Sequence, residues 1–158
     1  MDPADLVQQL WDIEAIKQLK ARYFRFVDAK RWDDFAMVFS KDAHLVVPEG
    51  GMDERGREAV VASVSSALKG VRTRHHGHMP EIEITGSDTA RGTWALFDYI
   101  ELADGPSGAP VGFQGYGHYT EEYVREDGEW RIASLLVTRL RIDPLAGGVP
   151  GAHRGVDS

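Results

Sequence analysis

The sequence contains no cysteine, and this absence excludes several kinds of chemistry at once. Without a thiol the chain can form no disulfide, offer no thiolate nucleophile and build no cysteine-based metal site. The absence also fits a protein of the reducing cytoplasm, where we expect this one to reside.

Positive charge is scarce, and long apolar runs are missing. Lys and Arg total 18 against 25 Asp and Glu, a formal net charge of −7. Nucleic-acid binders and polybasic membrane-surface proteins need a concentrated basic surface, so we expect neither partner. No apolar run approaches the roughly 20 residues that span a bilayer. The acidic N-terminus also lacks the basic and apolar regions of a signal peptide.

The first half of the chain has helical periodicity. Apolar residues recur at steps of three and four from Asp5 to Lys30, which predicts a long amphipathic helix. A shorter helical pattern covers Trp32 to Phe39. A third covers Gly56 to Leu68, with Gly70 as its cap. Between them, His44 to Val47 has the pattern of a short strand.

The second half alternates with a period of two, which is typical of strands. The predicted strands are Arg72–His78, Glu81–Thr85, Thr89–Glu101, Phe113–Arg125 and Trp130–Ile142. Helices followed by antiparallel strands indicate an α+β fold, with three N-terminal helices packed on a curved, mostly antiparallel sheet. Glycines within the long strands favour a sheet that curls into a cone-shaped half-barrel and encloses a pocket for an apolar ligand.

The chain divides into one domain and a tail. We assign residues 1–143 to the α+β domain and residues 144–158 to a Gly/Pro-rich C-terminal tail. Such a tail either lies across the mouth of a pocket or adopts no regular structure.

Two ionisable residues of the first helix occupy positions that do not favour their side chains. Tyr23 lies on the apolar stripe, and Asp28 follows at the helix C-terminus. A carboxylate there opposes the helix dipole by roughly 0.3–1 kcal/mol, so a compensating partner such as histidine is expected. The alternative is that Asp28 turns the chain in solvent.

Three histidines lie in the strand Arg72–His78. A period of two sets His75 on one face, whereas His76 and His78 share the other face with Arg72 and Arg74. We therefore expect His75 to point inward, either as a catalytic base or as a hydrogen-bonded core residue. His76 and His78 lack an obvious third ligand, so we predict no metal site.

A second acidic residue interrupts an apolar row. Asp98 shares its face with Trp94 and other apolar residues, and burial alone would raise its pKa. It is either a pocket residue or a structural anchor. Arg139 lies in a similar inward phase, as an anchor for substrate or as a salt-bridge partner of Asp98. We include Arg139, Trp94, Tyr116 and His118 as candidate substrate-binding residues.

Several segments together match a known pattern. They are Asp12–Lys17, Lys20–Asp28, His75–Ile82, Gly92–Trp94, Gly117–Tyr123 and Asp127–Trp130. With them the chain, from about residue 10 to 142, resembles the SnoaL-like, scytalone-dehydratase-like family of the nuclear-transport-factor-like superfamily. It is most similar there to the bacterial bile acid 7α-dehydratases.

The resemblance implies a catalytic set at Tyr23, Asp28, His75 and Asp98, with Arg139 also matched. It implies no cofactor and a homo-trimer or homo-dimer. With this catalytic set we expect His75, oriented by Asp28, to remove a proton from carbon beside a carbonyl. Tyr23 hydrogen-bonds the carbonyl oxygen, and a protonated Asp98 donates to that oxygen or to a leaving hydroxyl.

The predicted activity is that of a cofactor-independent lyase or isomerase acting on an apolar, ring-containing molecule such as a steroid or polyketide. One alternative is a polyketide cyclase of the SnoaL type. Another is a non-catalytic assembly subunit, like the small subunit of ring-hydroxylating dioxygenases.

Overall fold

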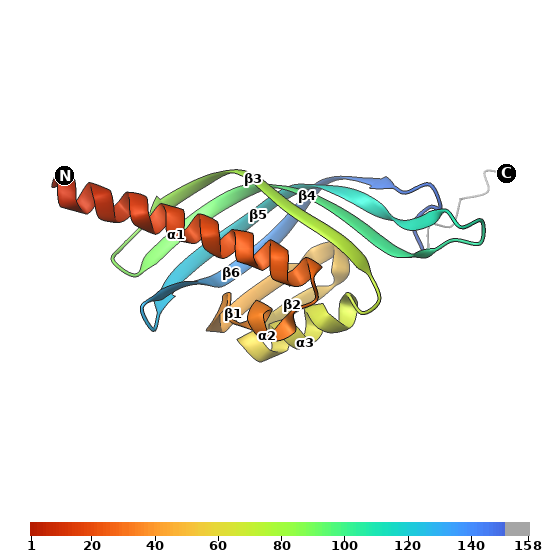
Figure 1. Ribbon diagram of the computed structural model, residues 1–158, viewed down its shortest axis with the longest axis horizontal. Coiled ribbons are helices and arrows are strands. Elements are labelled where there is room, and N and C mark those ends of the chain that lie inside the picture. Colours follow the sequence, from red (N-terminus) through yellow and green to blue (C-terminus); the bar gives the residue numbers. More distant parts are fainter. Residues whose placement is uncertain (151–158) are drawn as a thin grey trace.

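The computed structural model describes residues 1–150. It confirms an α+β fold, with three helices and one open, curved, mostly antiparallel sheet (Figure 1). The six strands are ordered β2-β1-β6-β5-β4-β3. The pair β1–β6 is parallel, and the other four neighbouring pairs are antiparallel.

The long helix α1 spans Pro3–Asp28 and runs diagonally across one face of the sheet (Figure 1). The side chain of Asp2 caps its first turn by accepting a hydrogen bond from the backbone N–H of Ala4. Its apolar stripe is buried from Ile16 onward, whereas Leu6 and Leu10 in the first turns are exposed. After Asp28 the chain turns through Lys30, whose φ is +58°.

The smaller elements lie together below the long strands in Figure 1. They are α2 (Trp32–Ala36), β1 (Phe39–Val47), the short 3-10 helix η1 (Pro48–Gly50), β2 (Met52–Arg55) and α3 (Arg57–Ala67). Strand β1 joins this group to the main sheet, because it pairs with β2 on one side and with β6 on the other.

Four long strands form the body of the sheet. They are β3 (Arg72–Ile84), β4 (Thr89–Asp104), β5 (Pro110–Glu126) and β6 (Glu129–Pro144). Burial alternates along β4 and β5, so one face packs on the helices and the core and the other faces outward.

Three local expectations were wrong. The second helix is shorter than predicted, because Phe39 already pairs with Ile132 of β6 and belongs to β1. The two strands predicted between residues 72 and 85 are one strand, β3, whose register shifts between His78 and Glu81. Strand β2 was not predicted, because only four residues of an apparent loop form it.

The predicted tail begins at Pro144, which is the last residue of β6. Its first residues are hydrogen-bonded to the start of β5: the N–H of Leu145 donates to the carbonyl of Gly112, and the N–H of Gly147 donates to that of Pro110. The remainder of the predicted tail, residues 151–158, lies outside the described residues.

Candidate active site

Asp28 and His75 form a hydrogen-bonded pair between the end of α1 and strand β3. The His75 Nδ1 atom lies 2.7 Å from Asp28 Oδ1, and the backbone N–H of His75 donates to Asp28 Oδ2 at 2.9 Å. The His75 side chain is 13% exposed and the Asp28 side chain is 19% exposed. The pair is therefore shielded but still reachable.

This contact defines the state of the imidazole. A carboxylate accepts hydrogen bonds, so Asp28 selects the tautomer that carries its proton on Nδ1. The Nε2 atom of His75, which then carries the free lone pair, is the basic atom of the Asp28–His75 pair. The same division of roles, an acidic residue orienting a histidine base, occurs in hydrolytic triads.

Thr73 and Lys30 complete the surroundings of Asp28. The Thr73 hydroxyl donates to Asp28 Oδ1 at 2.8 Å, and Lys30 Nζ in turn donates to Thr73 Oγ1 at 2.8 Å. Burial works to raise the pKa of Asp28, but the hydrogen bonds and charge of His75 and the Thr73 hydroxyl outweigh it and lower that pKa. Asp28 is therefore held as the carboxylate, with the compensation that its place at the helix end requires.

Asp98 lies beside His75 and is paired with Arg139. His75 and Asp98 are direct cross-strand neighbours in the β3–β4 register. Both guanidinium ends of Arg139 donate to Asp98, with Nη1 at 2.8 Å from Oδ1 and Nη2 at 2.6 Å from Oδ2. This two-bond pairing requires both carboxylate oxygens as acceptors, which favours the salt-bridge interpretation over a protonated Asp98.

A glycine makes room for this pair. A Cβ at Gly115 would lie 2.1 Å from Arg139 Nη1 and 2.3 Å from Asp98 Oδ1, closer than any real contact. Gly115 is also the β5 residue paired with Asp98. Strand β5 therefore leaves a space at this position that the ion pair fills.

Tyr23 is buried on the inner face of α1, as the sequence predicted. Burial raises the pKa of its phenol, and the carboxylates of Glu121, Asp98 and Asp28 raise it further. The hydroxyl consequently stays protonated and is available as a hydrogen-bond donor. Tyr23, Asp28, His75 and Asp98 thus face the same interior.

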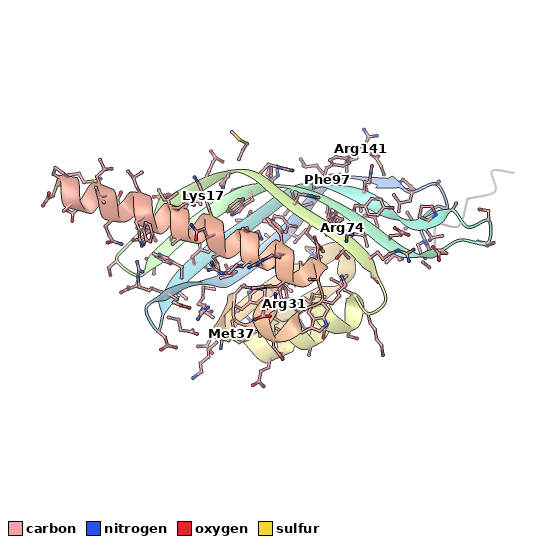
Figure 2. The ribbon with its side chains drawn as sticks, viewed as in Figure 1. Lys17, Arg31, Met37, Arg74, Phe97 and Arg141 are labelled. Carbon is pink, nitrogen blue, oxygen red and sulfur yellow. The ribbon has the colours of Figure 1, made fainter. Side chains whose placement is uncertain are left out.

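The four predicted substrate-binding residues fall on different faces. Arg139 and Trp94 lie inside, although the Trp94 indole N–H is used by the Tyr123 hydroxyl at 2.8 Å. Tyr116 and His118 belong to the outer face, because Gly115, Gly117 and Tyr119 occupy the inward positions of β5. Tyr116 is 37% exposed and packs on Phe97 of β4, which is labelled near the top of the sheet in Figure 2. Tyr116 and His118 therefore do not line the site.

The interior also holds an ion pair that sequence reasoning missed. Lys20 of α1 and Glu121 of β5 pair with both side chains at 0% exposure. Glu121 also accepts a hydrogen bond from Tyr123. The signal for it lies in the two patterns: Lys20 stands in the apolar stripe of the helix, and Glu121 stands between Tyr119 and Tyr123 in the inward phase of its strand.

Gly77 sets how closely α1 approaches β3. A Cβ at Gly77 would lie 2.7 Å from Phe24 Cζ and 3.3 Å from Trp94 Cε3. The Phe24 ring occupies the space that a side chain at residue 77 would need. The close approach brings the end of α1 to the strand that carries His75.

Other potential sites are less developed. A surface hollow lies between the first turns of α1 and the β3–β4 turn and borders Asp12 and Arg125, away from His75. Within residues 1–150, no three His, Asp or Glu side chains are grouped as metal ligands. No helix in that range is long and apolar enough to cross a membrane.

A family model described as the SnoaL-like domain matches residues 8–135. The chain belongs to the SnoaL-like family. Among curated proteins, this SnoaL-like chain is 26% identical over 135 residues to a probable cyclase, FGR4, of Gibberella zeae, with 79% of the chain and 89% of the cyclase covered.

Solved structures share the SnoaL-like fold. The hexachlorocyclohexane dehydrochlorinase LinA-type3 of Novosphingobium barchaimii LL02 has a TM-score of 0.76 at 24% identity, with 89% of this chain and 94% of that one covered. A scytalone-dehydratase-like protein of Novosphingobium aromaticivorans has a TM-score of 0.75 at 18% identity, with 97% and 99% covered. At these identities the likeness shows the fold alone.

Proposed function

We propose that this SnoaL-like chain is a cofactor-independent lyase or isomerase that removes a proton from carbon. The observation that carries the proposal is the contact of Asp28 with the His75 ring at 2.7 Å, which leaves Nε2 as a base beside a buried phenol and an ion pair. The names of similar proteins, a probable cyclase, a dehydrochlorinase and a scytalone-dehydratase-like protein, support this kind of enzyme.

In the proposed reaction His75 Nε2 accepts a proton from the carbon next to a carbonyl group. The electron pair of the broken C–H bond moves toward the carbonyl oxygen, which accepts a hydrogen bond from the Tyr23 hydroxyl. In a dehydration the electron pair of the enolate then forms the double bond and expels a hydroxyl from the neighbouring carbon, and the proton on His75 Nε2 passes to that hydroxyl, which leaves as water. In an isomerisation the same proton returns to a different carbon and the double bond shifts. Positioned base catalysis of this kind contributes about 10²–10⁴-fold in rate.

We propose for Asp98 a role other than the proton donor expected from the sequence, because it is paired with Arg139. Both oxygens of Asp98 accept from Arg139, so Asp98 holds the guanidinium rather than donating a proton. Arg139 also lies over the ring of Phe113, with 5.3 Å between the guanidinium carbon and the ring centroid. We assign Arg139 to binding a polar group of an otherwise apolar, ring-containing substrate such as a steroid or polyketide.

The test measures carbon-bound proton exchange, so it does not depend on knowing the product. Steroid and polyketide ketones are incubated with the protein in D₂O, and mass spectrometry follows deuterium uptake and loss of water. We expect His75→Ala to lower the rate at least about 100-fold. The matched control is His76→Ala, which removes the neighbouring, outward-facing histidine and should keep the rate. A wild-type rate in His75→Ala would refute the proposal.

A cyclase is the second candidate, supported by the relative from Gibberella zeae. The same carbanion would then attack a second carbonyl of a polyketide and close a ring. Cyclised products without water loss would identify this outcome. A non-catalytic assembly subunit has no need of the Asp28–His75 contact, so it is the weaker alternative.

We further propose that the protein is a homo-oligomer, a trimer or a dimer, associating through the outer face of the sheet. Exposed apolar side chains there include Tyr116, Leu136 and Leu140, the last at 75% exposure. The cytoplasmic location and the absence of nucleic-acid and membrane partners stay predictions from composition.

A further inference from the structure

Tyr119 carries a buried hydroxyl without a hydrogen-bond partner. Among the buried side-chain polar atoms of residues 1–150, it shares this state with Arg131 Nε alone. The other nitrogens of Arg131 bind Met37 and Glu129, whereas Tyr119 has no other polar atom on its side chain. Leaving a buried hydroxyl unpaired costs about 1–3 kcal/mol, and phenylalanine would fill the same space without that cost. The Tyr119 hydroxyl therefore has its hydrogen free for a partner outside the described chain, either a bound water or a ligand.

The Tyr119 ring lies next to the ring of Tyr23. Their centroids are 6.3 Å apart, and the planes meet at 71°. The Lys20 ammonium lies over both faces, 3.9 Å from the centroid of Tyr23 and 3.8 Å from that of Tyr119. One buried cation thus holds the two phenols in a fixed relation to each other.

The polar groups of Lys20, Glu121, Tyr123 and Trp94, which lie near Tyr119, already bond one another. Glu121 accepts from Lys20 through Oε1 and from the Tyr123 hydroxyl through Oε2. Tyr123 in turn accepts from the Trp94 indole N–H. This network uses its own donors and leaves the Tyr119 hydroxyl out.

The groups that face Tyr119 electrostatically are those of the site. Burial raises the pKa of its phenol most, followed by Tyr23, Asp98 and Glu121, with Arg139 acting in the opposite direction. The hydroxyl is therefore protonated. Its ring is buried beside that of Tyr23, with 6.3 Å between the ring centroids, and within the described chain it has no group to donate to.

We infer that Tyr119 is a second catalytic hydrogen-bond donor, which binds the same substrate oxygen as Tyr23. This inference rests on the proposed proton abstraction. The C–H electron pair moves to the carbonyl oxygen and the proton moves to His75 Nε2. The oxygen then accepts hydrogen bonds from two phenol hydroxyls instead of one. Two fixed donors stabilise an enolate more than a neutral ketone, because the negative charge on the oxygen develops only as the proton leaves.

The test uses 2-naphthol as a probe, since it is an apolar fused ring whose oxygen, in the deprotonated naphtholate form, resembles that of an enolate. Its binding is followed by fluorescence with the full-length protein. Tyr119→Phe keeps the ring and removes only the oxygen, and we expect the Kd to rise about tenfold. Tyr23→Phe should weaken binding similarly, and the double variant should bind more weakly than either. The matched control is Tyr116→Phe, which removes a hydroxyl from the outer face of the same strand and should leave the Kd unchanged.

The melting temperature separates this role from a structural one. Because the hydroxyl has no partner within the described chain, Tyr119→Phe should melt at the wild-type temperature or higher. An unchanged Kd in Tyr119→Phe, a clear loss of thermal stability in it, or no binding of 2-naphthol by the wild type would each overturn the inference. The naphthol measurement needs no proton transfer, so it can succeed even if His75→Ala retains turnover, and the two proposals fail separately.

Discussion

Replacing Lys20 with methionine should destabilise the protein severely. The ammonium and its Glu121 partner are both fully buried, and the pair links α1 to β5. Methionine has a similar length but no charge, so Lys20→Met leaves the Glu121 carboxylate inside the protein with the Tyr123 hydroxyl as its donor. Removing one partner of a buried ion pair typically costs about 3–5 kcal/mol.

That cost is large against the whole stability of a domain, which is about 5–15 kcal/mol. For a chain of this size each kcal/mol lowers Tm by roughly 2–4 °C, so a drop of roughly 6–20 °C is expected. Urea unfolding followed by circular dichroism at pH 7 gives the free energy directly. The double variant Lys20→Met/Glu121→Gln removes both charges and should recover most of the loss, because the unpaired charge, and not the lost attraction, dominates the cost. A loss below about 1 kcal/mol in Lys20→Met, or a double variant no more stable than the single one, would show this reasoning to be wrong.

Three further predictions follow from the site and the outer face. Gly115→Ala should displace the Asp98–Arg139 pair, cost about 1–3 kcal/mol in urea unfolding and slow deuterium uptake, since its Cβ overlaps both side chains; unchanged stability and rate would contradict the close approach. The pKa of Asp28 is lowered on folding, so its contribution is present above its ordinary value of 3.8 and is lost as the pH falls through the lowered one. The stability gap between wild type and Asp28→Asn should therefore narrow from pH 5 to pH 2 in urea unfolding, and a constant gap would count against it. Leu140→Glu should shift the protein toward monomers in analytical ultracentrifugation, whereas an unchanged oligomer would exclude this face.

The sequence was enough to predict the fold class and the Asp28–His75 contact. Both depend on local periodicity: α1 carries Asp28 to its end, and strand phase selects His75 from three histidines. Tyr116 and His118 were expected to bind substrate, but they lie on the outer face, because Gly115 and Gly117 occupy the inward positions of β5. Glycine contributes no hydropathy signal, so the sequence does not mark the inward face of this part of the strand.

The buried ion pair could not be predicted by the same means. Lys20 and Glu121 are 101 residues apart, and each alone belongs to a residue type that is usually exposed at the surface. Only the packing of α1 on the sheet brings their phases together. Likewise, the unpaired state of the Tyr119 hydroxyl depends on which neighbours are already bonded, which no pattern along one strand contains.

Gly77 has a consequence for how the activity of such a protein could diverge. Tyr23 and Asp28 are carried by one uninterrupted helix, and Phe24 of that helix rests in the space above Gly77. Any side chain at residue 77 would push Phe24 outward, and the rigid helix would carry the phenol and the carboxylate away from His75 together. A single position outside the Asp28–His75 contact thus adjusts the places of Tyr23 and Asp28 in concert. Under the proposed function, a substitution there would change the reaction rate without altering the chemistry of the site.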